Sequence, residues 1–317
     1  MSRPGASGPT GRGARRAAVG VATAGAAAAA ALGWALVEPL RYTLRRHDVP
    51  VLPPGSAPVR VLHVSDLHLT PAQRDKVAWV RDLAWLEPDL VISTGDNMAH
   101  RDALPTVLEA YAPLLELPGA FVLGSNDYFA PRPKNPLRYL QPDARSGTAD
   151  QEHLPAAELA EAFRRAGWRD LSNRRDAVAL GGLDVSLVGV DDPHLDRDRF
   201  PAATGPRGRL HLGVAHAPYT RVLDAMHADG CDLVLAGHTH GGQLRVPLIG
   251  ALVTNSDLDT GRAAGLHGWP GPRPDRPGGA GSTWLHVSAG LGTSPYAPVR
   301  FACLPEATLL TLVPAGS

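Results

Sequence analysis

The sequence is nearly without cysteine and lysine. Cys231 and Cys303 are its only cysteines, too few for a disulfide framework and without the paired spacing of a zinc or redox motif. Lys76 and Lys134 are its only lysines, so arginine carries nearly all of the positive charge. The two cysteines could pair with each other or remain buried free thiols, and the sequence leaves both alternatives open.

An excess of charge of either sign is also missing. The chain of 317 residues has 31 basic and 31 acidic side chains, which gives a formal net charge of zero. This balance indicates no nucleic-acid partner, since nucleic-acid-binding proteins usually carry an excess of basic residues. An apolar fraction of 44% is enough for a sizeable core, in one large domain or two ordinary ones.

One long stretch without charge lies near the N-terminus. Residues 17–37 contain no charged side chain, and about 21 residues are enough for a helix to cross a bilayer. Alanine and glycine dominate this stretch, so its insertion into a membrane is only modestly favourable. Three interpretations remain open: an uncleaved signal anchor, which we favour, a cleaved signal peptide, and an alanine-rich helix packed on protein.

The segments around this stretch suggest a domain plan. Residues 1–16 are rich in glycine, serine, proline and arginine and are predicted to be disordered. Residues 38–58 are predicted to be a juxtamembrane linker that ends in a stiff, proline-rich connector, and residues 59–317 to be the catalytic domain. Three arginines before the stretch favour a cytoplasmic N-terminus and an extracytoplasmic catalytic domain, although three more beyond it weaken that orientation. Cleavage of the helix would make the domain a secreted protein.

The catalytic segment alternates between predicted strands and helices. The predicted strands cover 59–65, 89–94, 120–123, 209–215, 231–236, 284–288 and 308–313, and the predicted helices cover 71–85, 103–114 and 154–166. Gly181-Gly182 between two apolar runs predicts a hairpin. Residues 128–147 are predicted to form a surface loop. The alternation predicts an α/β fold whose site lies at the carboxyl ends of the strands.

Polar residues that metal ions prefer follow five of these strands. They are Asp66, His68, Asp96, Asn126, His216, His238 and His240. Each alone has an ordinary explanation, such as a helix cap or a turn residue, but their recurrence at successive strand ends favours a metal site. Oxygen and nitrogen donors without a thiolate suit Mn²⁺, Fe²⁺ or Zn²⁺. A carboxylate such as Asp96 can bridge two ions about 3.5–4 Å apart.

Five motifs carry a family resemblance. They are Asp66-x-His68, Gly95-Asp96-Asn97, Gly124-Ser125-Asn126-Asp127, His216 and Gly237-His238-Thr239-His240-Gly241-Gly242. In order and spacing they resemble the motifs of calcineurin-like metallophosphoesterases, and are most similar to the bacterial YkuE/YaeI-like phosphodiesterase branch. The resemblance implies a four-layer α/β/β/α sandwich of two mixed sheets with two divalent metal ions at their edge.

The resemblance also implies ligands and chemistry. The first ion would take Asp66, His68, Asp96 and His240, and the second would take Asp96, Asn126, His216 and His238. A hydroxide activated by both ions would hydrolyse a phosphodiester or pyrophosphate bond. Family relatives that act on nucleotide-sugar lipids make a lipid-linked phosphate an expected substrate, beside phosphorylated small molecules. The alternatives are a broad phosphomonoesterase and a catalytically impaired metal-binding membrane protein.

The third motif departs from the family pattern Gly-Asn-His-Asp/Glu, whose histidine is thought to help protonate the leaving group. Aligned without a gap, Ser125 takes the ligand position and Asn126 the histidine position. Shifted by one residue, Asn126 remains a ligand and Asp127 replaces the acid. We favour the shifted alignment because an amide oxygen is a better metal ligand than a neutral hydroxyl. Asn126, Asp127 and His216 are thus the expected catalytic residues, with His100 as another candidate acid.

Several other residues have two interpretations each. Asn97 could bind phosphate or occupy a turn, and 191–194 could offer ligands or form a turn after a strand. The glycine-containing segment 290–296 could direct backbone N–H groups at a substrate. Arg300 could meet a phosphate, although a solvated arginine is the commoner case. His63 lies within a strand and is predicted to be a packed core residue.

Overall fold

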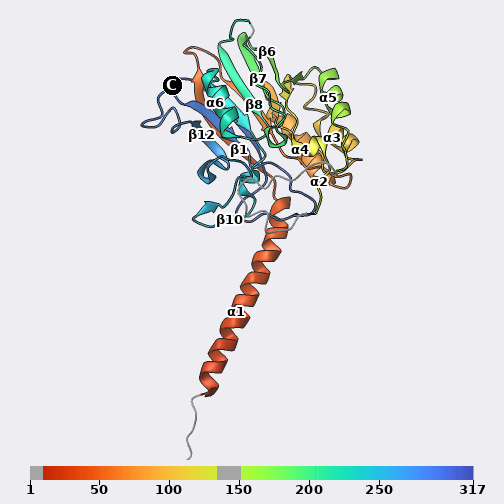
Figure 1. Ribbon diagram of the computed structural model, residues 1–317, viewed down its shortest axis with the longest axis vertical. Coiled ribbons are helices and arrows are strands. Elements are labelled where there is room, and N and C mark those ends of the chain that lie inside the picture. The colour runs from red at the N-terminus through yellow and green to blue at the C-terminus, as the bar shows by residue number, and fades with distance from the viewer. Residues whose placement is uncertain (1–9, 134–150, 204, 317) are drawn as a thin grey trace, which may run out of the picture.

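Two six-stranded sheets form the centre of the domain (Figure 1). The computed structural model describes residues 10–133, 151–203 and 205–316. The first sheet has the order β1 (Thr43–Leu52), β14 (Glu306–Pro314), β2 (Val59–Val64), β3 (Leu90–Ser93), β4 (Gly119–Phe121) and β5 (Arg169–Asp170). The second sheet has the order β12 (Gly265–Trp269), β13 (Thr283–Val287), β9 (Leu233–Ala236), β8 (Leu210–Ala215), β7 (Leu183–Gly189) and β6 (Arg174–Leu180). Both sheets combine parallel and antiparallel pairs and are therefore mixed.

Helices cover the outer faces of both sheets. The helices are α2 (Arg74–Asp82), α3 (Leu104–Tyr111), α4 (Ser125–Tyr128), α5 (Ala156–Arg165) and α6 (Thr220–Ala228). Shorter elements are η1 (Glu38–Leu40), η2 (Leu83–Leu86), η4 (Pro193–Leu195), η5 (His240–Gly242), η6 (Thr260–Arg262) and the hairpin strands β10 (Arg245–Val246) and β11 (Gly250–Ala251). The apolar side chains of α2, α3 and α5 pack on the first sheet, and those of α6 pack on the second.

Strand periodicity explains the layers. Successive side chains of a strand point to opposite faces, and in β2 Leu62 joins the core under α2, α3 and α5 whereas Val61 joins the core between the sheets. The central core takes Leu212 and Leu235 from the second sheet. Three cores therefore separate four layers, and the predicted α/β/β/α sandwich is confirmed.

The predicted glycine hairpin is also present. Strands β6 and β7 pair antiparallel, with Leu180 opposite Leu183. Gly181 and Gly182 between them have φ angles of 52° and 84°, which two-residue hairpin turns of this kind require and glycine adopts without steric cost. The two cysteines are not paired with each other. Cys231 and Cys303 are both buried free thiols, which settles the alternative that the sequence left open.

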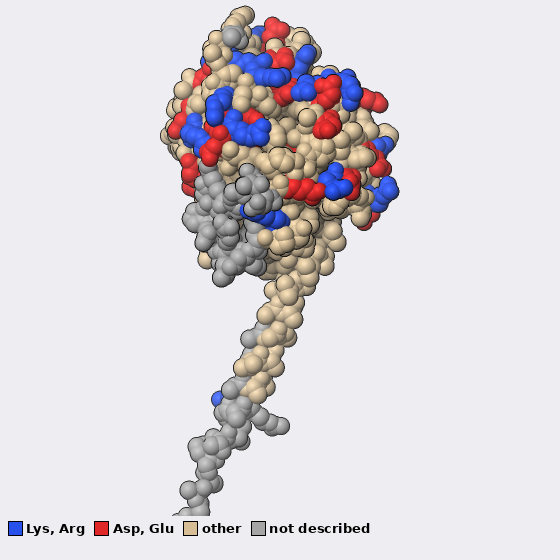
Figure 2. Space-filling model, turned by 45° about the vertical axis from the view of Figure 1, so that its right-hand side comes forward, with Lys and Arg blue, Asp and Glu red and all other residues tan. Residues whose placement is uncertain are grey.

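Helix α1 (Thr10–Val37) extends away from the domain (Figure 1). It begins seven residues before the predicted start at residue 17, so the predicted disorder of 1–16 is wrong for 10–16; residues 1–9 lie outside the described part of the chain. The stretch Val21–Leu40 is long and apolar enough to cross a membrane by length and composition, with a mean hydropathy of 1.5. Figure 2 shows acidic and basic side chains mixed over one face of the domain, whereas residues 17–37 of α1 include no charged residue.

The predicted linker 38–58 is not a free connector, because its middle part forms strand β1 of the first sheet. Strand β1 pairs in parallel with β14, from Thr43 opposite Glu306 to Leu52 opposite Pro314. Pro50 is compatible with this position because β1 is an edge strand, where one side of the backbone needs no partner. The folded domain therefore begins at Thr43 instead of residue 59. The predicted loop 128–147 lies mostly outside the described residues.

Candidate metal centre

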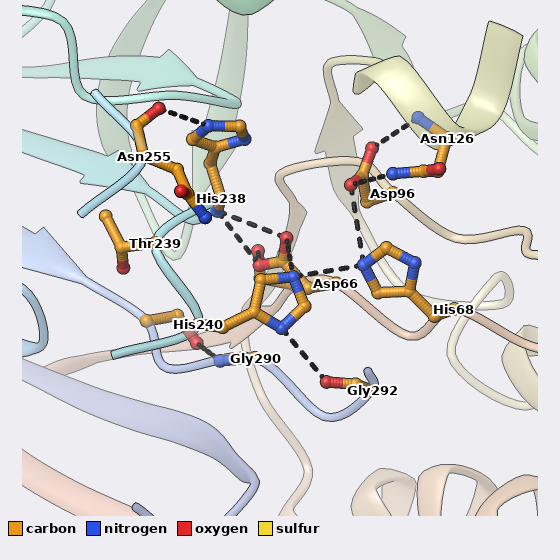
Figure 3. A network of polar contacts seen from close by, with 12 residues as sticks. Asp66, His68, Asp96, Asn126, His238, Thr239, His240, Asn255, Gly290 and Gly292 are labelled. Carbon is orange, nitrogen blue, oxygen red and sulfur yellow. Dashed lines mark hydrogen bonds and ion pairs between the residues drawn. The ribbon is translucent and has the colours of Figure 1, made fainter. Parts of the chain in front are cut away.

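All seven predicted ligands come together where the two sheets meet, joined by short contacts between polar atoms. Figure 3 labels each of them except His216. The contacts are His68 Nε2 to Asp96 Oδ2 (3.4 Å), His216 Nε2 to Asp96 Oδ1 (3.5 Å), Asn126 Nδ2 to Asp96 Oδ2 (2.8 Å), His240 Nε2 to Asp66 Oδ1 (3.7 Å) and His238 Nδ1 to His216 Nε2 (3.2 Å). The first sheet contributes the residues that follow β2, β3 and β4, and the second sheet contributes those that follow β8 and β9. Asp96 lies at the centre because it contacts three of the others.

Four of these residues form a compact set, which we call the first group. It consists of Asp66, His68, Asp96 and His240, each with one ligand atom within 4.8 Å of those of the others. The two histidines approach with Nε2 atoms 3.1 Å apart. Their side chains are almost fully buried, with 3% of His68 and 12% of His240 exposed, so few water molecules can share this space.

Hydrogen bonds determine which nitrogen of His240 faces the cluster. Nδ1 lies 3.0 Å from the carbonyl oxygen of Gly292, and since a carbonyl only accepts, Nδ1 carries the hydrogen. Burial lowers the pKa of His240 well below its usual value and that of His68 to about 4, so both rings are neutral. The Nε2 lone pair of His240 therefore points at His68 and at carboxylates, an electron-rich set that fits a cation.

The three remaining predicted ligands, Asn126, His216 and His238, form a second group together with Asp96. Nδ1 of His216 donates to the carbonyl oxygen of Thr94 (2.7 Å) and Nε2 of His238 donates to that of Asn255 (2.9 Å). The other ring nitrogens, Nε2 of His216 and Nδ1 of His238, face each other at 3.2 Å. Ring N–H groups that donate to carbonyls while the other nitrogens converge are typical of metal-binding histidines.

The pKa of His216 shifts in the opposite direction to those of His68 and His240. Burial would lower its pKa, but the nearby carboxylates of Asp96, Asp192 and Asp66 outweigh burial and raise the pKa to about 9. Burial also raises the pKa of Asp66, to about 6. For Asp96 the contribution of burial is overcome by His216 and His68, and its pKa falls below the usual range. Negative charge thus collects around His216 and Asp96, as a cation site requires.

The backbone is unusual at five of the seven residues. Asp66, His68, Asp96, His238 and His240 have φ angles of 52°, 43°, 54°, 69° and 48°. Non-glycine residues rarely adopt this left-handed conformation, and such residues concentrate at functional sites. Between the last two histidines, Thr239 has a φ of −69°. This alternation turns two rings that are one residue apart toward different groups, which an extended segment could not do.

Two glycines are required by close approach. A Cβ at Gly124 would collide with the Asp96 carboxylate and lie 2.7 Å from the His216 ring. A Cβ at Gly237 would collide with Ser65 and lie 2.6 Å from Asp66 Oδ2. The glycines of the third and fifth motifs therefore leave room for the ligands themselves.

The third motif places Asn126 and Asp127 differently. Asn126 lies against Asp96, to which its backbone N–H donates at 2.7 Å. Asp127 is fully buried and accepts backbone N–H groups from Gly124 (3.0 Å), Asp96 (2.9 Å) and Asn97 (2.8 Å). Burial raises its pKa to about 7, with Asp96 as a second cause. Asp127 thus holds the backbone of the Gly95-Asp96-Asn97 loop against that of Gly124. The side-chain amide of Asn97 also contacts Asp127, at 3.3 Å, and belongs to the same network of hydrogen bonds.

The loop after β13 supports His240 from behind. Arg300 is fully buried and donates to the carbonyl oxygens of Ala289 (2.7 Å), Gly290 (3.1 Å) and Gly292 (2.8 Å). The expectation of a solvated arginine is therefore wrong. The backbone N–H groups of Leu291 and Gly292 donate to carbonyls of Ser65 and Asp66, so these two amides hold the β2 loop and not a substrate. The burial of Arg300 depends on how this loop folds back on itself, which the sequence pattern does not reveal.

A chain of hydrogen bonds runs from Asp66 into the core between the sheets. Ser65 Oγ donates to Asp66 (2.5 Å), Thr94 Oγ1 donates to Ser65 (2.6 Å), and Thr94 meets His63 Nε2 at 3.0 Å. Nδ1 of His63 lies 2.8 Å from Nδ1 of His286. Since each hydroxyl hydrogen is already used, His63 must donate through Nε2 and accept at Nδ1. The prediction that His63 is a core residue is confirmed, and its ring also helps to orient Asp66.

The segment 191–194 lies beside the second group. Asp192 accepts the backbone N–H of His194 (2.9 Å) and so starts the turn of η4. Its other oxygen is buried with no hydrogen-bond partner in the described parts of the chain, and burial raises its pKa to about 7. The His194 ring lies 4.5 Å from the His238 ring. His100, the other candidate acid from the sequence, lies in a different environment. Its side chain is half exposed and its ring accepts the backbone N–H of Asp102 (3.1 Å).

Comparison with known proteins agrees with this geometry. Residues 59–242 match the calcineurin-like phosphoesterase family. The chain is 28% identical over 282 residues to the phosphodiesterase YaeI of Escherichia coli, covering 87% of this chain and 90% of that protein. It is 24% identical over 291 residues to the uncharacterized metallophosphoesterase YkuE of Bacillus subtilis, covering 87% and 86%.

A further relative is a transmembrane protein with a metallophosphoesterase domain from Bos taurus. The two chains are 27% identical over 278 residues, which cover 84% of this chain and 56% of the bovine protein. The family match extends over more than half of the sequence and ends at Gly242, just after the two histidines that close the cluster. The chain belongs to the calcineurin-like phosphoesterase family.

Proposed function

We propose that the chain is a membrane-anchored phosphodiesterase that depends on two divalent metal ions. The observation that carries this proposal is the convergence of the first and second groups on Asp96, with three histidine rings held by backbone carbonyls. The family membership supports phosphoester hydrolysis, and the name of YaeI supports a diester substrate.

The donor sets fit two ions that share one carboxylate. Asp66, His68, Asp96 and His240 would hold the first ion, and Asp96, Asn126, His216 and His238 would hold the second. When bound, Mn²⁺, Fe²⁺ or Zn²⁺ at these positions would supply the nucleophile and neutralise charge on the phosphoryl oxygens. The Asn126 amide would turn its oxygen toward the ion; amide orientations follow from the hydrogen-bond network and reverse readily.

The leaving group needs a proton donor, and the geometry favours His194 for this role. Its ring lies against His238 of the second group and Nδ1 contacts the Tyr219 hydroxyl at 3.1 Å. Asp127 is less suited because its two oxygens already accept backbone N–H groups. His100, the other candidate, belongs to a half-exposed surface turn with Asp102.

Helix α1 supports a proposal for the substrate class and the location. A membrane-spanning stretch that ends just before the first strand would hold the cluster close to a lipid surface. We therefore propose a lipid-linked phosphoester as the substrate class, with the domain outside the cytoplasm. The transmembrane bovine relative supports a membrane location for this kind of domain.

The test is turnover of two simple substrates by the full chain in detergent, with Mn²⁺, Fe²⁺ or Zn²⁺ added in turn. We expect hydrolysis of bis(p-nitrophenyl) phosphate to exceed that of p-nitrophenyl phosphate. Faster turnover of the monoester would favour the phosphomonoesterase alternative. Failure to hydrolyse either substrate at full metal occupancy would favour a metal-binding protein that has lost catalysis with the third-motif histidine.

A further inference from the structure

Beyond the N-terminal helix, the exposed large apolar side chains of the described residues are most numerous in one short segment after the metal centre. They belong to Leu244, Val246, Leu248, Ile249 and Leu252, with exposed fractions of 42%, 37%, 108%, 75% and 46%. The segment forms the hairpin of β10 and β11, which pairs through two residues on each side. Single exposed apolar side chains are common, but five within nine residues mark a surface that binds something apolar.

Hydrogen bonds connect this hairpin to the end of α1. The backbone N–H of Arg245 donates to the carbonyl oxygen of Phe301 (2.9 Å), and the N–H of Phe301 donates back to Gln243 (3.0 Å). The preceding residue, Arg300, donates its N–H to the carbonyl oxygen of Ala35 in α1 (2.9 Å). The hairpin and the helix are thus held on the same short segment, and Figure 1 shows β10 on the side of the domain from which α1 leaves.

A buried carboxylate fixes the helix end to the same segment. Glu38 is 2% exposed and accepts the backbone N–H groups of Ala302 (3.0 Å) and Cys303 (2.5 Å). Trp34 of α1 donates its ring N–H to Glu38 (2.7 Å). The direction in which α1 leaves the domain is therefore fixed by hydrogen bonds, as is its position beside the hairpin.

No spacer separates the helix from the sheet. The candidate span ends at Leu40 and β1 begins at Thr43, so a bilayer that contains α1 must reach the adjoining surface of the domain. Leu36, Val37 and Leu40 at the helix end are exposed, as the tip of the hairpin is. Arg41 at the helix end and Arg245 in the hairpin line a common pocket, where guanidinium groups could meet lipid phosphates.

We propose that the β10–β11 hairpin inserts its tip, Leu248 and Ile249, into the same bilayer that α1 spans. The partner is a phospholipid surface, and the hairpin is a second membrane contact beside the helix. Because Leu244 follows His240 by four residues, this contact holds the metal centre next to the headgroups. The inference rests on α1 as a membrane anchor and narrows the proposed substrate to phosphoesters presented at the bilayer surface.

The test measures the depth of the hairpin in a bilayer. Leu248→Cys in the full chain is labelled with an environment-sensitive dye and reconstituted into phosphatidylcholine and phosphatidylglycerol vesicles. Ala179→Cys, on β6 beside the far hairpin turn, is the matched control, and the wild-type chain with its buried Cys231 and Cys303 is the labelling blank. We expect blue-shifted emission and quenching by lipid-attached nitroxides at position 248, with neither effect at position 179.

Equal, unquenched emission from both positions would overturn the proposal. A blue shift at position 248 without quenching by lipid nitroxides would also overturn it, because a second protein and not the bilayer would then cover the hairpin.

A companion variant separates this inference from the proposed function. The double variant Leu248→Ser, Ile249→Ser should leave turnover of soluble bis(p-nitrophenyl) phosphate unchanged. It should weaken the contact of the hairpin with lipid, which a dye on Val246→Cys in the same chain measures by its quenching. Quenching at position 248 in a chain that hydrolyses no diester would contradict the proposed function alone. Hydrolysis of the diester without quenching would contradict the membrane contact alone.

Discussion

The first and second ligand groups share Asp96 but differ in charge and packing. The first group has two carboxylates and two neutral rings within 4.8 Å of one another. The second group shares only the carboxylate of Asp96 and adds the neutral amide of Asn126 with His216 and His238. Because carboxylates contribute most of the attraction for a hard divalent ion, we expect the first group to bind its ion more tightly. The second group borders His194 and departs from the family pattern, so we expect it to determine the leaving-group chemistry.

The largest effect is expected when the shared ligand changes. Asp96→Asn removes a negative charge from both groups, so both ions should be lost and diester turnover should fall by about 1000-fold or more. Metal analysis and bis(p-nitrophenyl) phosphate hydrolysis measure the two effects together. Asp176→Asn, exposed on β6, is the matched control and should change neither. Activity retained by Asp96→Asn would show that the two groups do not share this ligand.

A smaller loss is expected from a methyl group placed beneath the second group. Gly124→Ala puts a Cβ against Asp96 and the His216 ring, so turnover should fall by about 100-fold, as for displacement of one catalytic ligand. Affinity for the second ion should fall more than affinity for the first, measured by metal titration. Gly33→Ala, where a Cβ meets open space, should behave as wild type. An unaltered Gly124→Ala enzyme would mean that the close approach of Asp96 and His216 to this loop is not needed for activity.

The role of His194 separates the two groups by chemistry. His194→Asn should slow hydrolysis of esters with poorly acidic leaving groups by about 10- to 100-fold, the range for loss of a general acid, and leave nitrophenyl esters nearly unchanged. A series of aryl esters with rising leaving-group pKa measures this dependence. His100→Ala serves as the comparison and should follow the wild-type line. If the two variants exchange these behaviours, His100 is the proton donor instead.

A change at Lys76 tests how the loop that contains Asp66 and His68 of the first group is stabilised. This residue is 4% exposed, and its ammonium donates to the carbonyl oxygen of Leu67 (2.8 Å), between Asp66 and His68. Burial lowers its pKa to about 7, with Arg300 as a second cause. In the unfolded chain the lysine keeps its proton up to about pH 10, so keeping it charged in the buried site destabilises the fold at neutral and lower pH. This destabilisation disappears as the pH rises from about 7 to about 10, because the buried lysine is then neutral.

Lys76→Met should therefore be more stable than wild type at pH 6, by about 1–2 kcal/mol, and lose this advantage by pH 10. Thermal unfolding in detergent at both pH values measures the difference. A constant difference between the two proteins across this range would show that Lys76 keeps an ordinary pKa in the fold.

The sequence predicted most of the strands and the seven residues that cluster at their ends because these signals are local. Buried strands appear as apolar runs, and each of the seven residues lies shortly after the end of such a run, as Asp96 does after Leu90–Ser93. Strand β1 was missed because its middle, Arg45-Arg46-His47-Asp48, is polar at the exposed edge of a sheet and only Val49 and Leu52 are fully buried. Its partner β14 lies more than 250 residues further along the chain, so no local pattern contains the pairing.

The remaining features depend on how the loops fold. Arg300 is buried because three carbonyls of its own loop accept its N–H groups. The carboxylate of Asp127 is fixed because the loop of Asp96 turns its N–H groups toward it. The left-handed backbone at His238 and His240 likewise reflects the site and not the propensity of histidine. These residue types were visible in the sequence, but their roles required the packed fold.

The most direct test of two groups joined at Asp96 is the number of divalent ions bound per chain. Inductively coupled plasma mass spectrometry on the metal-loaded full chain should give two ions per chain for wild type. It should give one tightly bound ion for His238→Ala, which retains the first group. His240→Ala should weaken the tighter ion. A single ion per wild-type chain at full diester turnover would contradict the account.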